Sequence, residues 1–600
     1  MSIQNVNLFV WLARWQWLVL TLVLCSPKFL LAASGAQEFS GDSETTGTNV
    51  RIRRPIAIES THLPNRLIVA NSASGSLSVI NSVRHQRVAE FEVALQAGGL
   101  AADQHGRFFL ITDRAQARLR CLHLITENQI QPEWEMQTVG DCRTVAVSPN
   151  NKQIAVAGHW SRRVHLISVP RWQVQPADSQ VINFDFVPGE LYWLGNDHLL
   201  VLGAYEGRMA VVERDTGKVR QHVVPDHRFS GVTLRKEDNT LLLSDQVLNP
   251  LARSTRNDVF WGLMIANRIS EISVDHLLNL TGVEWLISDD RELGGPKNGK
   301  ADPAAIRWDP RFTLVTLSGV DQLGVAGSGG SEFSFVDTGR RPVDVIRDGS
   351  LAFVVNQLDD SVTVVDLDER VTLKTISLGE APEPTLAQLG ERLFFDGRLS
   401  LDGWMSCHSC HVDGHTNGQL NDNFSDGSYG TPKRVLTLLG KSGSAPFAWN
   451  GSAESLEEQI HRSIVSTMQL DQAPRAQAVR AIAAYLKTLP VAPAIQRKEG
   501  QETRGAIERG RGLFQSLNCT QCHEPPFYTS PQNFDVGLTD EAGLKAFNPP
   551  SLLGLGQRDR FFHDNRASSL SELLTDYQHQ LPAPLTAEEA LDLLAFLKSL

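Results

Sequence analysis

Positive charge, cysteine and methionine are all scarce in this chain of 600 residues. The formal net charge is −12, which argues against binding to nucleic acid, because that function requires a basic surface. The chain has only seven cysteines and six methionines, so those that fall into a pattern are informative. The length is too great for a single hydrophobic core and predicts several domains.

Four of the cysteines belong to two copies of a C-x-x-C-H motif, here called boxes. Two cysteines at this spacing can form thioethers with the vinyl groups on one edge of a porphyrin, and the histidine that follows then points at the iron. One isolated box would also suit a zinc site or a thiol-redox pair, but a duplicated one favours c-type heme. We therefore predict two covalently bound hemes, with attachment and iron-binding residues Cys407, Cys410 and His411 in the first box and Cys519, Cys522 and His523 in the second.

The two boxes lie inside an internal repeat. The matching segments are 390–394 with 510–514, 446–456 with 560–570, and two apolar helical patterns, 483–489 with 594–600. In each copy an opening helix, a box, a loop and a closing helix follow one another, a layout typical of a small cytochrome c domain. We predict two mostly α-helical cytochrome c domains, residues 381–495 and 496–600, related by a pseudo-twofold axis.

Candidate ligands for the far side of each iron precede the closing helices. Met468 follows Cys407 by 61 residues, where a single-domain cytochrome c places its axial methionine, although methionine is also a common core filler. Aligning the closing helices without a gap puts His579 opposite Met468, and Tyr577 is a rival ligand two residues away. We predict that Met468 binds the first iron and His579 the second.

Several short segments around the boxes match a known family. They are Arg392–Asp396, Leu399–Ser400, Ser406–Cys407, Trp449–Gly451, Ser455–Gln459 and Phe562–Asp564. On these segments, residues 381–600 resemble the bacterial di-heme cytochrome c peroxidases and the related di-heme enzyme that matures a tryptophan-derived quinone. The resemblance implies that Trp449 lies between the hemes and relays electrons, and that Gln459 belongs to a peroxide pocket. The family pairs this glutamine with a proton-moving glutamate, but Thr467 stands there in this chain, so peroxide chemistry at the first heme is expected to differ.

From about residue 61 to 380 the pattern changes to short strands around polar turns. Residues 350–356 and 361–366 form one such pair, and 65–71 with 75–80 form another. The pattern recurs about every 40 to 50 residues, which predicts an all-β propeller of about seven blades that closes on itself and removes its sheet edges. The last copy resembles the YVTN repeat of surface-layer propellers.

The amino terminus is typical of an exported protein. Residues 1–36 contain an apolar run followed by small residues, as in a secretory signal peptide. The run is short for a membrane span, so the protein would be attached to a membrane only if this segment stayed uncleaved. Residues 37–60 are polar and predict a linker, in which the basic stretch Arg51–Arg54 is expected to be solvated. Export to the periplasm or the extracellular space agrees with the hemes, because bacteria attach c-type heme outside the cytoplasmic membrane.

Two features of the propeller leave alternatives open. Cys121 and Cys142 remain once the signal and the boxes are counted, and they form either a disulfide between adjacent blades or two buried thiols. Residues 250–310 are the least regular part of the propeller and contain three tryptophans. Core and turn roles are the preferred interpretation of this segment, and an insertion that reaches toward the hemes is the alternative.

These patterns together predict an exported di-heme oxidoreductase of the peroxidase type. One heme would pass electrons through Trp449 to the other, where peroxide or an organic substrate reacts, and the propeller would serve as a docking or substrate-binding platform. The expected partner is a redox protein such as a cytochrome or cupredoxin, or a small oxidant such as hydrogen peroxide. The alternative is a non-enzymatic di-heme electron carrier, in which both irons have permanent ligands.

Overall fold

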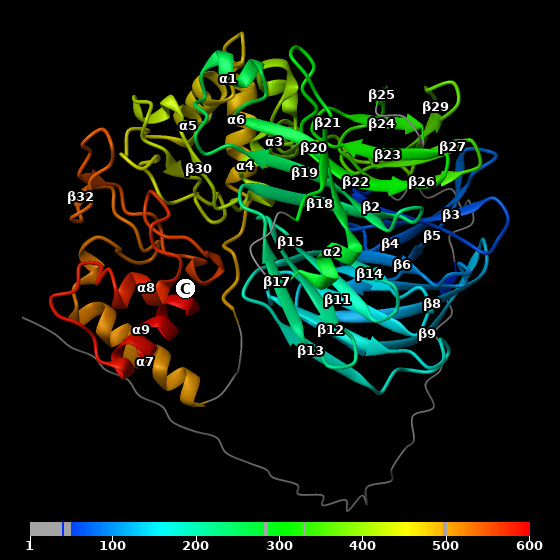
Figure 1. Cartoon of the computed structure of the whole chain (residues 1–600), viewed down its shortest axis with the longest axis horizontal. Helices are drawn as coiled ribbons and strands as arrows, with labels where there is room; N and C mark the ends of the chain where they lie inside the picture. Colours follow the sequence, from blue (N-terminus) through cyan, green and yellow to red (C-terminus); the bar gives the residue numbers. More distant parts are fainter. Residues whose placement is uncertain (1–38, 41–49, 281–285, 328–331, 496–500) are drawn as a thin grey trace, which may run out of the picture. The chain divides into compact units, whose positions relative to one another are not determined.

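The computed structural model describes residues 39–40, 50–280, 286–327, 332–495 and 501–600 (Figure 1). The predicted export signal, residues 1–36, lies outside this part of the chain. Within the described residues, no helix is both long enough and apolar enough to cross a membrane.

The amino-terminal part is a β-propeller, as predicted. The described residues form seven blades, each a four-stranded antiparallel sheet whose strands follow one another in sequence, and β1 (Phe39–Ser40) pairs with β9 at the edge of the second blade. The strands are β2 (Pro55–Ser60), β3 (Arg66–Asn71), β4 (Ser76–Asn81), β5 (Gln86–Glu92); β6 (Ala97–Ala102), β7 (Phe108–Asp113), β8 (Arg118–Thr126), β9 (Gln129–Gln137); β10 (Cys142–Val147), β11 (Gln153–Gly158), β12 (Arg163–Ser168), β13 (Ser179–Asn183); β14 (Pro188–Leu194), β15 (His198–Gly203), β16 (Arg208–Glu213), β17 (Val219–Val223); β18 (His227–Arg235), β19 (Thr240–Leu248), β20 (Ile265–Ser273), β21 (Asp289–Glu292); β22 (Pro303–Trp308), β23 (Phe312–Leu317), β24 (Gln322–Gly327), β25 (Ser334–Asp337); and β26 (Pro342–Asp348), β27 (Leu351–Asn356), β28 (Ser361–Asp366), β29 (Val371–Ser377).

The strand pairs share a sequence pattern in which an asparagine ends one strand and hydroxyl residues follow in the next. At the end of β27, Asn356 donates from Nδ2 to the hydroxyls of Ser361 and Thr363 in β28, at 3.0 and 2.8 Å. Asn71 at the end of β3 makes the equivalent pair of bonds to two serines of β4. These middle strands are buried along most of their length, because neighbouring blades cover both of their faces. A buried asparagine amide therefore needs hydroxyl partners in the next strand.

The basic stretch Arg51–Arg54, expected to be solvated within a linker, instead closes the propeller ring. The first strand, β2, begins inside the range assigned to the linker. The backbone N–H groups of Arg53 and Arg54 donate to the carboxylate of Asp360 in the last blade, at 2.9 and 2.7 Å. The buried guanidinium of Arg53 also pairs with Glu90 of the first blade at 3.0 Å. These partners are distant in the sequence, so a local pattern does not reveal them.

Cys121 in β8 and Cys142 in β10 are buried free thiols, so the second of the two alternatives holds. They belong to adjacent blades and pack in one apolar cluster. Burial raises the pKa of Cys142 to about 12, which keeps this thiol protonated.

The carboxyl-terminal part is mostly helical and repeats one layout twice. The first copy contains α3 (Leu386–Phe394), the short turns η1 (Gly397–Leu399) and η2 (Leu401–Gly403), α4 (Cys407–Cys410), η3 (Val412–Gly414), β30 (Leu420–Asn421), η4 (Phe424–Asp426), β31 (Lys433–Arg434), α5 (Leu456–Arg462), the π-helical turn η5 (Ser463–Thr467) and α6 (Ala476–Leu486). The second copy contains α7 (Gln501–Ser516), η6 (Cys519–Gln521), β32 (Phe534–Asp535), β33 (Ala546–Phe547), η7 (Leu555–Gln557), α8 (Leu570–Thr575) and α9 (Ala587–Ser599).

The opening and closing helices of each copy cross at a glycine. Helix α3 packs on α6 and α7 packs on α9 (Figure 1). A Cβ at Gly390 would lie 1.8 Å from the carbonyl oxygen of Ala481, and a Cβ at Gly510 would lie 2.0 Å from that of Asp592. Only glycine allows the two backbones to approach so closely. The sequence match between residues 390–394 and 510–514 therefore corresponds to one shared helix contact.

The fifth blade carries an insertion between β19 and β20 that packs against the first copy. The insertion contains α1 (Arg256–Phe260), and its Val259 joins one apolar cluster with Trp404 and Met468. A Cβ at Gly262 would lie 2.5 Å from the Trp404 ring. The blade also contains α2 (Val274–Asn279).

For residues 249–264 the alternative interpretation, a loop that reaches the helical part, is the one that holds. The preferred interpretation, core and turn roles within the propeller, fails there because packing against a distant segment leaves no local pattern. Of the three tryptophans, Trp261 is exposed, Trp308 is half-buried and Trp285 lies outside the described residues.

Candidate functional site

The two helical copies face each other through a pair of reciprocal hydrogen bonds. The backbone N–H of Arg434 donates to the carbonyl oxygen of His563 at 2.6 Å, and the backbone N–H of Asn548 donates to that of Trp449 at 2.8 Å. Trp449 and His563 hold equivalent places in the repeat. Each copy therefore supplies the same bond to the other, which is what a pseudo-twofold axis between them requires.

The segments that carry the candidate distal ligands also share one backbone conformation. Gln469 follows Met468 and has a φ of 57°, and Gln580 follows His579 and has a φ of 54°. A positive φ is uncommon for a residue other than glycine, so its occurrence at both places is informative. The backbone thus agrees with the alignment that puts His579 opposite Met468.

The first box opens onto a cavity of ≈ 250 Å³, lined mostly by the first copy and partly by residues 529 and 548–551 of the second. Helix α4 carries the box cysteines, and α5 with its continuation η5 supplies the opposite wall. The residues on its wall that the sequence singled out are Cys407, Cys410, His411, Trp449, Gln459, Thr467 and Met468. All residues predicted for the first heme therefore line one cavity.

A carboxylate of the propeller holds the first box. Asp302, directly before β22, is buried and accepts hydrogen bonds from the hydroxyls of Ser406 and Ser409 at 2.5 and 2.7 Å. Ser409 lies between the two box cysteines, and its Oγ also accepts from the backbone N–H of Ser406 at 2.9 Å. A third bond to Asp302, from Gln246 Nε2 at 3.2 Å, comes from the propeller itself. A buried carboxylate needs such donors, so these bonds fix the first box on the propeller.

The loop after the first box is tied to three further blades. Asp413 lies 3.4 Å from a guanidinium nitrogen of Arg341 and 3.6 Å from one of Arg143. Burial would raise the pKa of Asp413, but attraction to His408 and to both arginines is stronger and holds it well below its usual range. The ring of His408 in turn lies 3.3 Å from the guanidinium of Arg228.

The candidate iron ligands of the first cavity come from different elements. Burial lowers the pKa of His411 to about 4, so its imidazole is neutral near pH 7, the form that binds iron. Met468 is 4% exposed and directly follows the π-helical turn η5. Such a widened turn within a helix often marks a functional site. Here it brings the end of the helix, with Met468, to the cavity wall.

Gln459 presents an unsatisfied acceptor to the same cavity. Its Oε1 is buried and has no hydrogen-bond partner in the part of the chain that the structure describes, whereas its Nε2 donates to Ser463 Oγ at 3.2 Å. A buried acceptor of this kind can accept a hydrogen bond from a ligand in the cavity. Thr467, at the position of the family's glutamate, lines the cavity with a hydroxyl instead of a carboxylate.

The second box opens onto a larger cavity of ≈ 980 Å³, lined by Cys519, Cys522 and His523. The Nδ1 atom of His523 lies 3.1 Å from the carbonyl oxygen of Tyr528. Because a carbonyl oxygen only accepts, Nδ1 carries the proton and Nε2 keeps its lone pair for a metal. Burial is the main cause that lowers the pKa of His523, to about 4.

Both candidate distal residues line the second cavity, and they differ in solvent exposure. Tyr577 is 41% exposed, and its hydroxyl donates to the carbonyl of Arg566 at 2.9 Å. His579 is less exposed, and burial lowers its pKa. It also lies close enough to His523 to lower the pKa of that residue. The rings of both candidates lie 5.4 Å from that of Phe562.

Trp449 is one of the residues that line both cavities, together with Arg434 and residues 548–550. Its indole Nε1 donates to the carbonyl of Arg434 at 2.9 Å, which fixes the ring plane. The ring of His563 lies 6.3 Å away at an interplanar angle of 71°.

Comparison with known proteins agrees with this geometry. Residues 384–501 match the family model described as "Di-haem cytochrome c peroxidase". The matched residues include the first box and end before the second. The match supports peroxidase-like redox activity and implies two c-type hemes.

Two individual proteins similar to this chain are a MauG protein and a cytochrome c peroxidase. The methylamine utilization protein MauG of Methylophilus methylotrophus is 26% identical, over 36% of this chain and 82% of its own length. The cytochrome c551 peroxidase of Nitrosomonas europaea is 25% identical, over 36% of this chain and 79% of its own. Among solved structures, a hydrazine synthase chain of Kuenenia stuttgartiensis aligns with 54% of this chain and 98% of its own at 15% identity, with a TM-score of 0.44.

The cavities of the di-heme domain contain buried cations that fit the propionates of heme. Arg434, on the wall of both cavities, and Arg558, on the wall of the second, are buried and donate to backbone carbonyls. No carboxylate among the described residues pairs with either of them. Burial lowers the pKa of Arg434 to about 9 and that of Arg558 to about 10, and it also lowers the pKa of Lys441 in the first cavity. A porphyrin with two propionates supplies the negative charges that these cations lack.

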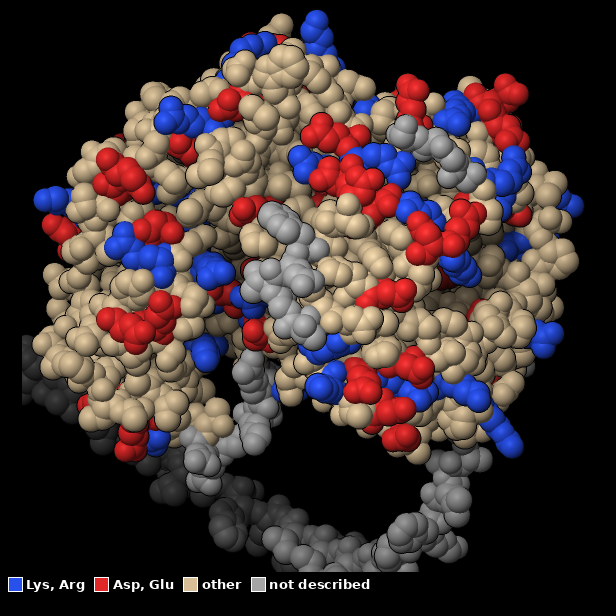
Figure 2. Space-filling model, viewed as in Figure 1, with Lys and Arg blue, Asp and Glu red and all other residues tan. Residues whose placement is uncertain are grey.

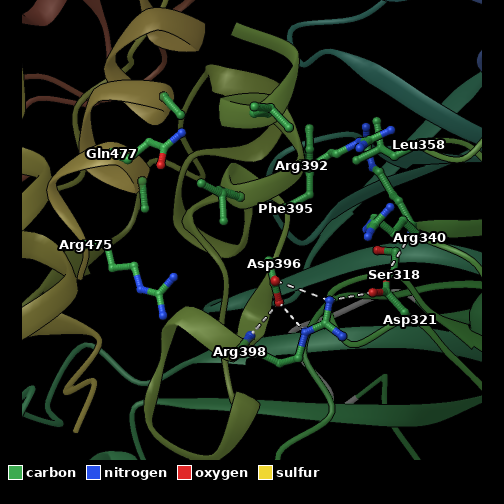
Figure 3. Close-up of a pocket in the computed structure, with 15 residues that line it drawn as sticks. Ser318, Asp321, Arg340, Leu358, Arg392, Phe395, Asp396, Arg398, Arg475 and Gln477 are labelled. Atoms are coloured by element: carbon green, nitrogen blue, oxygen red, sulfur yellow. Dashed lines mark hydrogen bonds and ion pairs between the residues drawn. The ribbon is translucent and has the colours of Figure 1, made fainter. Parts of the chain in front are cut away.

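A third cavity, of ≈ 390 Å³, lies where propeller loops meet α3 and α6 of the di-heme domain (Figure 3). Arg398 bridges Asp396 and Asp321 there, at 2.7 and 2.6 Å. Arg475 and Gln477 of the segment around α6 face the same space. The residues that line it include no cysteine, histidine or methionine, so it is a polar joint between the propeller and the first copy and not a heme site.

Sequence reasoning missed what the propeller contributes to the di-heme domain. Asp302, Arg228 and Arg341 belong to no motif, and their partners lie far along the chain. The nearest signal is the pair of serines, Ser406 and Ser409, around the first box. Buried hydroxyls at these places would have suggested an acceptor supplied from outside the repeat.

Proposed function

We propose that this protein is an exported di-heme oxidoreductase of the peroxidase type. Cys407 and Cys410 hold one heme through thioethers, and Cys519 and Cys522 hold the other. The observation that carries the proposal is the pair of cavities, each lined by the cysteines and histidine of one box and both lined by Trp449. Heme iron supplies one-electron redox chemistry and a place for peroxide to react.

His411 would bind the iron of the first site, and His523 that of the second. Met468 and His579 are the candidate ligands for the other side of each iron, and peroxide would react at an iron where that side is open. A thioether ligand favours the reduced metal more than an imidazole does, so with Met468 and His579 as ligands the first site would have the higher reduction potential. Electrons would then pass from the second site toward the first.

Electron entry is proposed at the second box, because this box is the accessible one. Gln521, between the second pair of cysteines, is exposed, whereas the corresponding Ser409 of the first box is buried against the propeller. A cytochrome or cupredoxin can approach the second box directly. On the face shown in Figure 2, acidic and basic side chains are interspersed, which suits brief encounters better than a strongly charged permanent interface.

Trp449 provides the contact between the two sites. Its hydrogen bond to Arg434 holds the indole in one plane, and its place on both cavity walls shortens the path for an electron. In the first cavity the free Oε1 of Gln459 can accept a hydrogen bond from the O–H of a peroxide. Thr467 offers a hydroxyl there but no carboxylate, so proton transfer relies on water or on a peroxide proton.

The propeller has a structural role toward the first site and leaves its other surfaces for partners. Asp302 and the arginines around Asp413 hold the first box and the loop after it. Residues 1–36 direct export, and a mature amino terminus near residue 37 in a periplasmic fraction is the expected result. Protein that keeps residues 1–36 in the cytoplasm would contradict export.

The second candidate function, a di-heme electron carrier without catalysis, is favoured by one observation. Met468 and His579 each line the cavity that their box opens onto, so both irons have a candidate permanent ligand. A permanently ligated iron transfers electrons but does not bind peroxide.

One set of spectra separates the two functions. Purified holoprotein is examined by optical and electron paramagnetic resonance spectroscopy in the oxidised, half-reduced and reduced states, with and without hydrogen peroxide. A peroxide-dependent spectral change with consumption of peroxide supports the enzyme. Two low-spin irons whose spectra do not change with peroxide in any redox state support the carrier.

A further inference from the structure

A buried tyrosine–histidine pair of the propeller lies beside the loop of the first box. Tyr205, in the turn between β15 and β16, and His159, directly after β11, are both buried. The phenolic oxygen of Tyr205 lies 2.6 Å from Nε2 of His159. They belong to neighbouring blades and play no part in the ligation or attachment of heme described above.

Ring contacts connect this pair to the di-heme domain. The ring of Tyr205 lies 4.8 Å from that of His415, and Tyr205 also packs against Val412. The backbone N–H of His415 donates to the carbonyl of Val412 at 2.8 Å, and Val412 directly follows His411. A path of one ring contact, one hydrogen bond and the backbone between Val412 and His411 therefore joins Tyr205 to the candidate ligand of the first iron.

The resting pair is neutral. Burial raises the pKa of Tyr205 well above its usual value and, together with Arg143, lowers the pKa of His159 well below its own. The phenol consequently donates to an unprotonated imidazole nitrogen. The charged groups that face His159 are Arg143, Asp141, Asp413 and Arg114.

Loss of an electron turns a phenol into a strong acid, and the acceptor for its proton is already in place. Transfer over a 2.6 Å hydrogen bond requires no movement of either ring. The imidazolium that results is stabilised by Asp141 and Asp413, which favour the charged form of His159.

We propose that Tyr205 is a redox-active residue that gives one electron to the first heme site and its phenolic proton to His159. Reduction of one hydrogen peroxide to two waters takes two electrons and two protons. Tyr205 supplies one of the electrons and becomes a neutral radical, the di-heme site supplies the other, and solvent supplies both protons. His159 keeps the phenolic proton until an electron donor restores the phenol. The step rests on the proposed function, because that function supplies peroxide as the oxidant.

Trp160 is the neighbouring aromatic residue that could compete for the oxidation. Its ring lies 5.7 Å from that of Tyr205 and 5.4 Å from that of His415. The guanidinium of Arg143 lies 5.9 Å from the centroid of the indole. A cation over the ring disfavours a tryptophan cation radical, whereas Tyr205 loses its proton and gains no charge. The radical therefore resides on Tyr205.

The test uses the full-length holoprotein with both hemes in the ferric state. Hydrogen peroxide is added without an electron donor, samples are freeze-quenched, and electron paramagnetic resonance spectra are recorded while peroxide consumption is followed in parallel. The expected signal is an organic radical that changes line shape when the protein contains ring-deuterated tyrosine. Tyr205→Phe should lose it. Tyr192→Phe, a change in the same blade away from the pair, should keep it. Heme content and the ferric optical spectrum check that each variant folds.

The outcomes separate this inference from the proposed function. An unchanged tyrosine signal in Tyr205→Phe overturns the inference, and so does peroxide consumption by the unmutated protein without any tyrosine signal. If peroxide is not consumed at all, the proposed function fails, and a soluble one-electron oxidant then replaces peroxide. In that experiment, a tyrosine radical that disappears in Tyr205→Phe supports the redox-active pair, and its absence from the unmutated protein overturns it.

Discussion

The two boxes share a sequence pattern and differ in what covers them. The first forms a helical turn, α4, whose middle residues His408 and Ser409 are buried against the propeller. The second forms the 3₁₀ turn η6, with Gln521 exposed. The asymmetry arises outside the repeat, because the crossing glycines, the reciprocal hydrogen bonds and the positive-φ glutamines are the same in both copies. A duplicated module can thus acquire two different sites through a neighbouring domain.

Removing the two cysteines of one box should produce the largest effect, because it removes the heme of that box and leaves the other. Cys407→Ser with Cys410→Ser, or Cys519→Ser with Cys522→Ser, should each lower the intact mass by one heme. The first-box variant should lose less thermal stability than the second-box variant, because Ser406 and Ser409 still bond to Asp302 when the first heme is missing. Mass spectrometry and thermal unfolding measure both effects. Loss of two hemes, or of none, in either variant would contradict independent attachment.

Changing the distal residues should show that each acts on its own site. Met468→Ala removes a buried side chain and should cost about 2–5 kcal/mol of unfolding free energy, with a lower reduction potential at the first heme only. His579→Ala should change the low-spin signal of the second heme only. Tyr577→Phe is the matched control for the second site. Redox titration and electron paramagnetic resonance provide the measurement, and a changed second heme in Tyr577→Phe would speak for the tyrosine.

Weakening the hydrogen bonds between the propeller and the first box should affect the first box and not the second. Asp302→Asn leaves an amide where two serine hydroxyls need an acceptor, and we expect a loss of about 1–3 kcal/mol in unfolding free energy. The reduction potential of the first heme should rise, because a buried negative charge near it is lost, while that of the second stays constant. Asp178→Asn, at an exposed aspartate, is the control. Equal shifts at both hemes would contradict a role confined to the first box.

The smallest expected change in stability is that of Trp449→Phe, at a residue that lines both sites. Trp449→Phe loses one hydrogen bond, worth about 1 kcal/mol, and keeps most of the packing. Electron transfer between the hemes should slow, while both optical spectra stay unchanged. Flash reduction followed by transient absorption measures the rate, with the exposed Trp261→Phe as control. Equal rates in the three proteins would rule out a relay through Trp449.

The sequence predicts the parts of this molecule that repeat. The spacing of the closing helices already pairs Met468 with His579, and strand pairs such as 350–366 predict the propeller. What it does not predict joins distant segments: Arg53 with Asp360, the insertion at 249–264 with the first copy, and Asp302 with its two serines. Each of these contacts depends on tertiary packing between residues whose local surroundings look ordinary.

The hold of Asp302 on the first box also constrains the order in which the protein matures. The propeller, residues 55–377, precedes both boxes in the chain, so it can fold before the boxes have been synthesised. Attachment of heme needs thiols that an attachment enzyme can reach, and the bonds of Ser406 and Ser409 to Asp302 cover one side of the first box. On the proposed function, we expect the first heme to be attached before this segment packs on the propeller, whereas the second box stays accessible afterwards.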